Sequence, residues 1–255
     1  MSARNIVYLF VGAVAGFFIG FALANNVSHS GANLARAGQT RPQNSNDKNS
    51  SSNVESNAAS SSLNDEELRA AIAKGDANPK DVSLQRNLGR GLYLYAMNTG
   101  QTRVLPDAVR MLKRAYDADP QNYETTVLMG QALFDAGQSG NFAMVSQSRR
   151  YFLQALERKP DDVNVRTELG LTYYFDKPSN PRRAVEEYRK SLGLAPRHEM
   201  TLQSLAAALI ALGETAEARQ RLDELQSVNP SNATLPNLRA QLARGGGGSS
   251  VKEKN

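Results

Sequence analysis

The chain has 255 residues, a mass of 27.7 kDa and a formal net charge of +5 at pH 7. It contains no cysteine, which excludes disulfides, thiol catalysis, iron–sulfur clusters and cysteine zinc sites. Residues 63–244 contain 24 Lys and Arg against 22 Asp and Glu, a difference of +2. This near balance lacks the clustered excess of base that marks a nucleic-acid interface, so no nucleic-acid partner is predicted.

A hydrophobic segment, Ile6–Ala24, carries no charge over 19 residues. As a helix that rises about 1.5 Å per residue it would span roughly 28 Å, enough for the hydrocarbon core of a bilayer. Arg4 precedes this transmembrane helix directly, whereas the next cation, Arg36, comes twelve residues after it, so residues 1–5 are expected in the cytoplasm. The sequence predicts a single-pass protein of a bacterial inner (cell) membrane whose folded part is periplasmic or extracellular.

The same segment has an alternative interpretation as a cleaved signal peptide. Ala22-Leu23-Ala24 is an acceptable cleavage site, and cleavage there would leave a soluble exported protein. The apolar run is longer than the roughly 7 to 15 residues usual in signal peptides, which favours a retained anchor. Gly12, Gly16 and Gly20 share one helix face, which predicts a homodimer through the membrane helix unless they reflect ordinary membrane composition.

Two other segments are predicted to be disordered. Residues 25–62 contain no aromatic residue, and Ser and Asn make up 18 of the 38 positions. Such a segment buries too little apolar surface to offset the entropy of ordering it, so it is predicted to be a flexible linker. The Gly-rich residues 245–255 form a predicted disordered tail.

Tandem repeats fill the region between these segments. Four copies of one pattern end in proline at intervals of 40, 36 and 34 residues, at Pro120, Pro160, Pro196 and Pro230. In the last copy, one apolar stripe at helical spacing ends at Gly213 and a second stripe follows, which predicts a helical hairpin. The repeats are expected at about residues 82–122, 123–162, 163–198 and 199–232.

The third copy shows the sequence pattern most fully. Small residues recur where two helices approach, and bulky ones fill the space between hairpins, at Leu169, Gly170, Tyr173, Ala184, Tyr188 and Pro196. This pattern resembles the tetratricopeptide repeat (TPR). The resemblance implies an all-α, right-handed solenoid of tandem helical hairpins over residues 63–244, with a capping helix at 63–75 and a solvating helix at 233–243.

The chain departs from the family pattern in two ways. The small residues of the two helices lie farther apart in the first two repeats, which predicts longer helices or loops near residues 98–107 and 136–147. The aromatic residue common near the start of the first helix is also missing. Looser packing is therefore expected at the positions that replace it, Gln85, Thr126, Arg166 and Leu202.

No catalytic or metal-binding pattern accompanies the repeats. A nucleophile with its base, a glycine-rich phosphate loop and a metal-ligand cluster each need set residues at set spacings, and none is present. The sequence predicts a non-enzyme without a cofactor or metal. Adjacent charged pairs such as Glu186-Glu187 and Arg149-Arg150 are interpreted as solvated surface.

The family resemblance implies that the first helix of each repeat lines a concave face. The predicted partner-binding groove there comprises Arg86, Arg90, Tyr93, Glu124, Val127, Gln131, Phe134, Asn164, Thr167, Leu171, Tyr174, Met200, Gln203, Ala207 and Ile210. The alternative is that these residues only pack repeat against repeat. A basic end and an aromatic middle would suit a peptide with an acidic end and apolar anchors.

The predicted function is therefore a membrane-anchored scaffold or adaptor that binds a protein or peptide partner, for assembly of an envelope complex. Two alternatives remain open. One is a subunit similar to the repeat proteins of cytochrome c maturation, which present an apoprotein for haem attachment. The other is an import or secretion receptor, which the charges around the hydrophobic segment disfavour because such receptors expose their repeats to the cytosol.

Overall fold

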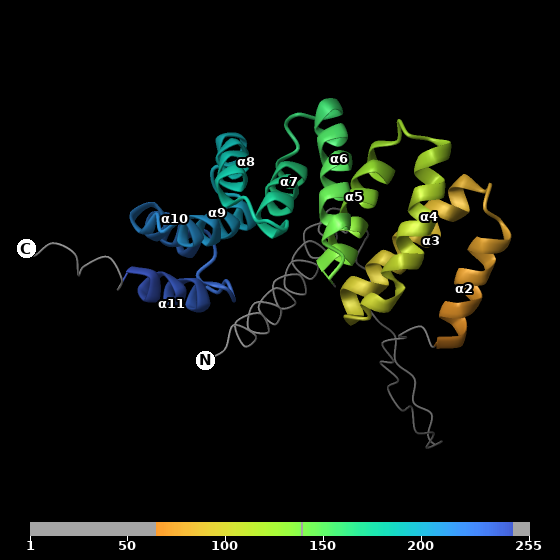
Figure 1. Ribbon diagram of the computed structural model, residues 1–255, viewed down its shortest axis with the longest axis horizontal. Helices are drawn as coiled ribbons and strands as arrows, with labels where there is room; N and C mark the ends of the chain where they lie inside the picture. Colours follow the sequence, from red (N-terminus) through yellow and green to blue (C-terminus); the bar gives the residue numbers. More distant parts are fainter. Residues whose placement is uncertain (1–64, 139, 247–255) are drawn as a thin grey trace, which may run out of the picture.

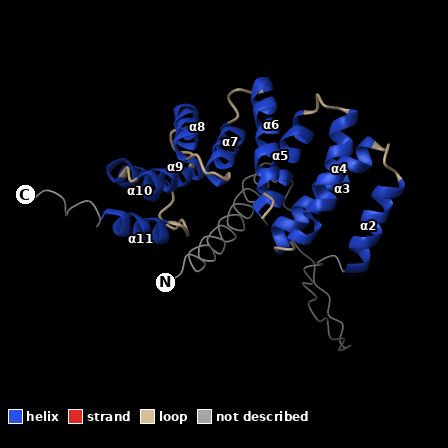
Figure 2. Ribbon diagram, viewed as in Figure 1, coloured by secondary structure: helices blue, strands red, loops and turns tan. Residues whose placement is uncertain are grey.

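The computed structural model describes residues 65–138 and 140–246, which fold into helices arranged in chain order along a curved row (Figure 1). No strand occurs in this described part (Figure 2), so the predicted all-α solenoid is confirmed there. The elements are α2 (Asp65–Ala77), α3 (Val82–Thr99), the short 3-10 helix η1 (Thr102–Val104), α4 (Leu105–Ala118), α5 (Tyr123–Gln138), α6 (Phe142–Arg158), α7 (Val163–Phe175), α8 (Pro181–Leu194), α9 (Glu199–Leu212), α10 (Thr215–Val228) and α11 (Leu235–Gly246).

The predicted membrane helix, its glycines Gly12, Gly16 and Gly20, and the linker at 25–62 lie outside the described residues. Within residues 65–138 and 140–246, no helix has both the length and the apolar character that a membrane span needs. Helix α11 continues to Gly246, so the first two residues of the predicted tail are helical.

Consecutive helices pair into four hairpins, α3 with α4, α5 with α6, α7 with α8, and α9 with α10 (Figure 1). Helix α2 contacts α3 at one end of the row, and α11 contacts α9 and α10 at the other. Local sequence sets where the helices begin and end. The side chains of Asp81 and Asp162 accept hydrogen bonds from backbone N–H groups three residues on, and Gly213 ends α9 in the left-handed conformation at φ 75°.

Glycine sets the close approach of the two helices within a hairpin. A Cβ at Gly170 would lie 2.3 Å from Cε1 of Tyr188, and one at Gly130 would lie 2.6 Å from Cε1 of Phe152. Both aromatic rings are fully buried. The Leu-Gly positions of the repeat pattern therefore fix the register in which α7 meets α8 and α5 meets α6.

The extra residues of the first two repeats lengthen their helices. Helices α3, α5 and α6 have 18, 16 and 17 residues, against 13 or 14 in α7 to α10. The first hairpin also contains η1 in its connection. The larger repeats thus project about one helical turn beyond the smaller ones.

The expectation of loose packing near the start of the first helices is wrong at three of the four positions, Arg166 being the one that stays partly exposed. Gln85, Thr126 and Leu202 have no exposed surface. The side-chain amide of Gln85 donates to the carbonyl oxygens of Gly75 (2.6 Å) and Asn78 (2.9 Å), which ties α3 to the end of α2. A buried amide with satisfied hydrogen bonds takes the place of the missing aromatic ring.

Candidate functional site: the concave face

The first helices of the repeats, α3, α5, α7 and α9, lie on the inner side of the curved row. Each of them contacts the next first helix along the chain, whereas the second helices of neighbouring repeats contact one another less. Helices on the inside of a curved solenoid are closer together than those outside, so the concave face is formed by the first helices.

A concave polar seam, made of Tyr93, Asp135, Gln131 and Glu168, joins three of these helices. The Tyr93 hydroxyl of α3 donates to Oδ2 of Asp135 on α5 at 2.9 Å. The Gln131 amide of α5 donates to Oε1 of Glu168 on α7 at 2.7 Å. The other carboxylate oxygen of Glu168, Oε2, is covered and has no hydrogen-bond partner within the part of the chain that is described.

The two carboxyl groups of the seam titrate near neutral pH. Burial raises the pKa of Asp135 to about 7, although the hydrogen bond from Tyr93 acts in the opposite direction. Burial raises the pKa of Glu168 to about 8, with the Gln131 hydrogen bond opposing and the charge of Asp135 adding to the increase. A cation or a strong donor placed here would lower both pKa values and favour the ionised forms.

The predicted groove residues divide into two groups by exposure. Five are buried within the helix packing: Phe134, Thr167, Leu171, Met200 and Gln203. The Thr167 hydroxyl, for example, lies 2.7 Å from that of Thr201 on α9. Surface remains exposed or half-exposed on Arg86, Arg90, Tyr93, Glu124, Val127, Gln131, Asn164, Tyr174, Ala207 and Ile210. A partner on this face would meet the second group, while the first holds the repeats together.

The arginines at the basic end of the predicted groove lie near acids of the first and second repeats. Arg90 pairs with Glu124 at 2.9 Å, and Arg86 lies 3.9 Å from a carboxylate oxygen of Asp119. An acidic peptide end would therefore have to compete with these internal carboxylates for the two arginines.

Two residues that the sequence places on solvated surface lie instead in contacts between helices. Glu187 is 3% exposed and pairs with Arg166 at 3.2 Å. The Arg149 guanidinium lies 4.2 Å from the ring centre of Tyr173 and pairs with Asp176 at 2.5 Å. Adjacent like charges point to different sides of a helix, and the sequence alone does not show which side is covered.

Among the described residues no group of three or more His, Asp or Glu side chains could hold a metal ion. The one His there, His198, contacts Thr201 (2.6 Å) and Asn164 (3.0 Å), and burial lowers its pKa. His198 therefore links α7 to α9 through polar contacts.

No protein-family model matches the chain. Its helices superpose on those of known TPR structures at low sequence identity. A crystal structure of MamA has a TM-score of 0.51 at 21% identity, covering 66% of this chain and 90% of MamA. A thermophilic TPR protein of Thermus thermophilus has a TM-score of 0.50 at 15% identity, covering 70% of this chain and 96% of that protein. The chain has the tetratricopeptide-repeat fold.

Among curated proteins, the TPR chain is 22% identical over 168 residues to a BBSome complex member, the BBS4 homolog of Drosophila melanogaster. The match covers 64% of this chain and 33% of that relative, so the chain spans about a third of the length of the curated protein it matches. The repeat residues predicted a resemblance to the TPR, and the solved structures confirm it at the level of the fold.

Proposed function

We propose that this chain is a non-catalytic scaffold that holds a segment of a partner protein along the concave face of α3, α5, α7 and α9. The observation that carries the proposal is the concave polar seam, where Glu168 keeps one carboxylate oxygen unpaired. Leaving a covered acceptor unpaired costs free energy that a donor from a partner would recover. The half-buried apolar side chains of Val127, Tyr174 and Ile210 add contact surface on the same helices.

The partner segment that fits this face offers a hydrogen-bond donor or a cation to Glu168 and apolar side chains beside it. Because the seam carboxyls have raised pKa values, binding of a cationic side chain would be accompanied by proton release. TPR grooves of this kind suit an extended or a helical segment.

Site-specific photo-crosslinking of the full chain tests the proposal. A photoreactive residue at Asn164 or Arg90, both exposed on first helices, should crosslink the partner in cells. The same group at Glu157 or Gln226, exposed on the second helices α6 and α10, is the control. Tyr174→Ala should then weaken binding of the crosslinked partner with helicity unchanged. Crosslinks from the control positions alone would contradict a concave site.

The membrane anchor remains part of the same proposal, supported by the uncharged run Ile6–Ala24 and by Arg4 before it. The repeats would then work on the periplasmic or outer side of the membrane.

Amino-terminal sequencing of the membrane fraction decides between an anchor and a signal peptide, since cleavage leaves a chain that starts at Asn25. Protease added outside the inner membrane should remove the repeats. If the glycine face forms a dimer interface, crosslinking between two copies of the chain should decrease when Leu replaces Gly12, Gly16 and Gly20.

A further inference from the structure

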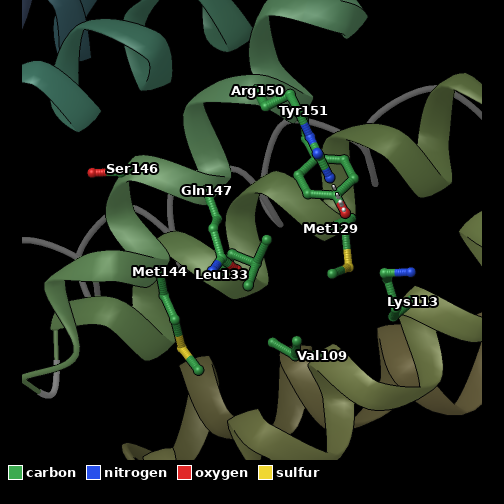
Figure 3. Close-up of a pocket in the computed structure, with 9 residues that line it drawn as sticks. All are labelled: Val109, Lys113, Met129, Leu133, Met144, Ser146, Gln147, Arg150 and Tyr151. Atoms are coloured by element: carbon green, nitrogen blue, oxygen red, sulfur yellow. Dashed lines mark hydrogen bonds between the residues drawn. The ribbon is translucent and has the colours of Figure 1, made fainter.

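A second candidate surface lies on the opposite side of the solenoid, between the second helices α4 and α6 and above α5. Side chains of these three helices enclose a cavity of about 590 Å³. Figure 3 shows them around one opening, with Lys113 of α4 on one side and Arg150 of α6 on another. The apolar side chains of this convex groove are Val109, Met129, Leu133, Met144 and Tyr151.

In the later repeats, charged side chains bridge the corresponding spaces between neighbouring second helices, α6 with α8 and α8 with α10. Between α8 and α10, Arg189 reaches across to Glu217 at 2.6 Å. Between α6 and α8, the Tyr173 ring of α7 lies beside two guanidinium groups, with Arg149 at 4.2 Å and Arg183 at 5.7 Å from its centre. Side chains of the chain itself thus fill or cross both of these grooves.

The convex groove between α4 and α6 lacks such a bridge because of two residue differences. Counted from the small residue of each second helix, Lys113 and Gln147 occupy the positions of Arg189 and Glu217. A neutral amide cannot attract Lys113 across the groove, and Lys113 pairs instead with Asp117 of its own helix at 2.6 Å. Met129 and Leu133, 2% and 3% exposed, form the floor of this groove, and the half-buried Val109 and Met144 line its sides.

The rim of the convex groove carries a cation, Arg150, that no acid of the described residues neutralises. The Arg150 guanidinium lies 5.2 Å from the ring centre of Tyr151 and donates to its hydroxyl at 3.3 Å. Within residues 65–138 and 140–246, no carboxylate pairs with Arg150. Tyr116 meets the Tyr151 ring edge-on at 5.0 Å and donates to Gln154, which closes one end of the groove.

We propose that the convex groove docks an amphipathic helix of a partner protein, with bulky apolar side chains between α4 and α6 and a carboxylate on Arg150. Methionine side chains adapt to apolar ligands of varied shape, and two of them, Met129 and Met144, line this groove. A groove of this size, with half-buried apolar side chains on its sides and a cation at its rim, has the features of a helix-docking site. Because this surface is separate from the concave face, the scaffold can hold two partners at once.

Methyl NMR of the full chain in lipid nanodiscs, with labelled methionine methyl groups, tests the site directly. The probe is a synthetic helical peptide with two leucines four residues apart and flanking glutamates. It should shift the methyl signals of Met129 and Met144 and leave that of Met200 unchanged, since Met200 lies on α9. A peptide with lysines in place of the glutamates should bind more weakly. Shifts at Met200 alone, no shifts, or equal response to the lysine peptide would overturn the proposal.

Two variants sharpen the test. Arg150→Gln should weaken the peptide by on the order of tenfold, with a reduced dependence on salt. Arg182→Gln removes the same charge from an exposed position on α8 and should have no effect. Gln147→Glu places in the convex groove the acid that Glu217 supplies between α8 and α10. It should attract Lys113 across the groove and weaken peptide binding. Ser227→Glu adds the same charge at an exposed position on α10 and should leave binding unchanged. Unchanged binding by both groove variants, with Met200 signals showing an intact fold, would exclude the convex groove.

Discussion

The two halves of the solenoid join their repeats in different ways. The C-terminal half is built on a continuous apolar core that extends from Phe134 on α5 to Leu242 on α11. In the N-terminal half, the buried apolar residues fall into two smaller clusters, around Leu92 and around Leu133, within longer helices. Polar contacts such as Tyr116–Gln154 join the early repeats across these clusters. The same repeat pattern therefore gives a tightly coupled C-terminal half and an N-terminal half whose junctions keep groups available to a partner.

The largest expected difference comes from the buried ion pair of the C-terminal half. Glu187→Ala leaves the Arg166 guanidinium, 16% exposed, without its carboxylate. Removing one partner of a buried pair costs roughly 3 to 5 kcal/mol, so the free energy of unfolding should fall by about that amount. Urea denaturation followed by circular dichroism measures it. A loss below about 1 kcal/mol would mean that the pair does not hold α7 against α8.

The concave polar seam should make stability depend on pH. In the folded state Asp135 and Glu168 have pKa values of about 7 and about 8, above the ordinary values of 3.8 and 4.5, so they keep their protons to higher pH. The folded state binds more protons at these two groups than the unfolded state between these limits, so their contribution to stability is greatest below about pH 4. It falls as pH rises toward 8 and then levels off.

Asp135→Asn should remove much of this decline, by about 2 to 4 kcal/mol between pH 4 and pH 8, because an amide cannot ionise. Tyr93 can still donate to the amide oxygen. Unfolding in urea across this pH range measures the effect. Asp161→Asn, at an exposed position beside the cap of α7, is the matched control and should leave the slope unchanged. A slope that persists in Asp135→Asn would assign the pH dependence to other groups.

The repeat pattern predicted the hairpins because small residues at fixed spacing reflect a hard steric limit, as the contact of Gly170 with Tyr188 shows. Exposure of charged residues was less predictable. Glu187 and Glu186 are identical neighbours in the sequence, yet only Glu187 faces Arg166 across the hairpin. The convex groove was not predicted either. The groove stays unbridged because Lys113 on α4 faces the neutral Gln147 on α6. The sequence alone does not show that these two residues face each other.

Glycine substitutions should have opposite signs at a buried contact of the C-terminal half and at an exposed position of the N-terminal half. Gly170→Ala places a methyl group against Tyr188 and should cost about 1 to 3 kcal/mol through overpacking. Gly91→Ala adds a methyl group on the exposed side of α3, where no atom lies within 4 Å, and should stabilise by about 0.5 to 1 kcal/mol through helix propensity. Thermal and urea denaturation of both variants measures the two changes. If both substitutions destabilise, the exposed face of α3 is covered by a part of the protein outside residues 65–138 and 140–246.

The smallest effect is expected at the exposed ion pair of the concave face. Arg90 and Glu124 are each 55% exposed, so solvent and salt screen their attraction. A double-mutant cycle with Arg90→Gln and Glu124→Gln should give a coupling energy below about 0.5 kcal/mol, decreasing further at high salt. The same cycle at Arg189 and Glu217, which are 52% and 27% exposed, is the C-terminal comparison and should give up to about 1 kcal/mol. If the coupling of Arg90 with Glu124 were the larger, the contrast between the halves would fail. A weak coupling has a functional consequence, because either side chain can then exchange its internal partner for a group of a bound protein at little cost in stability.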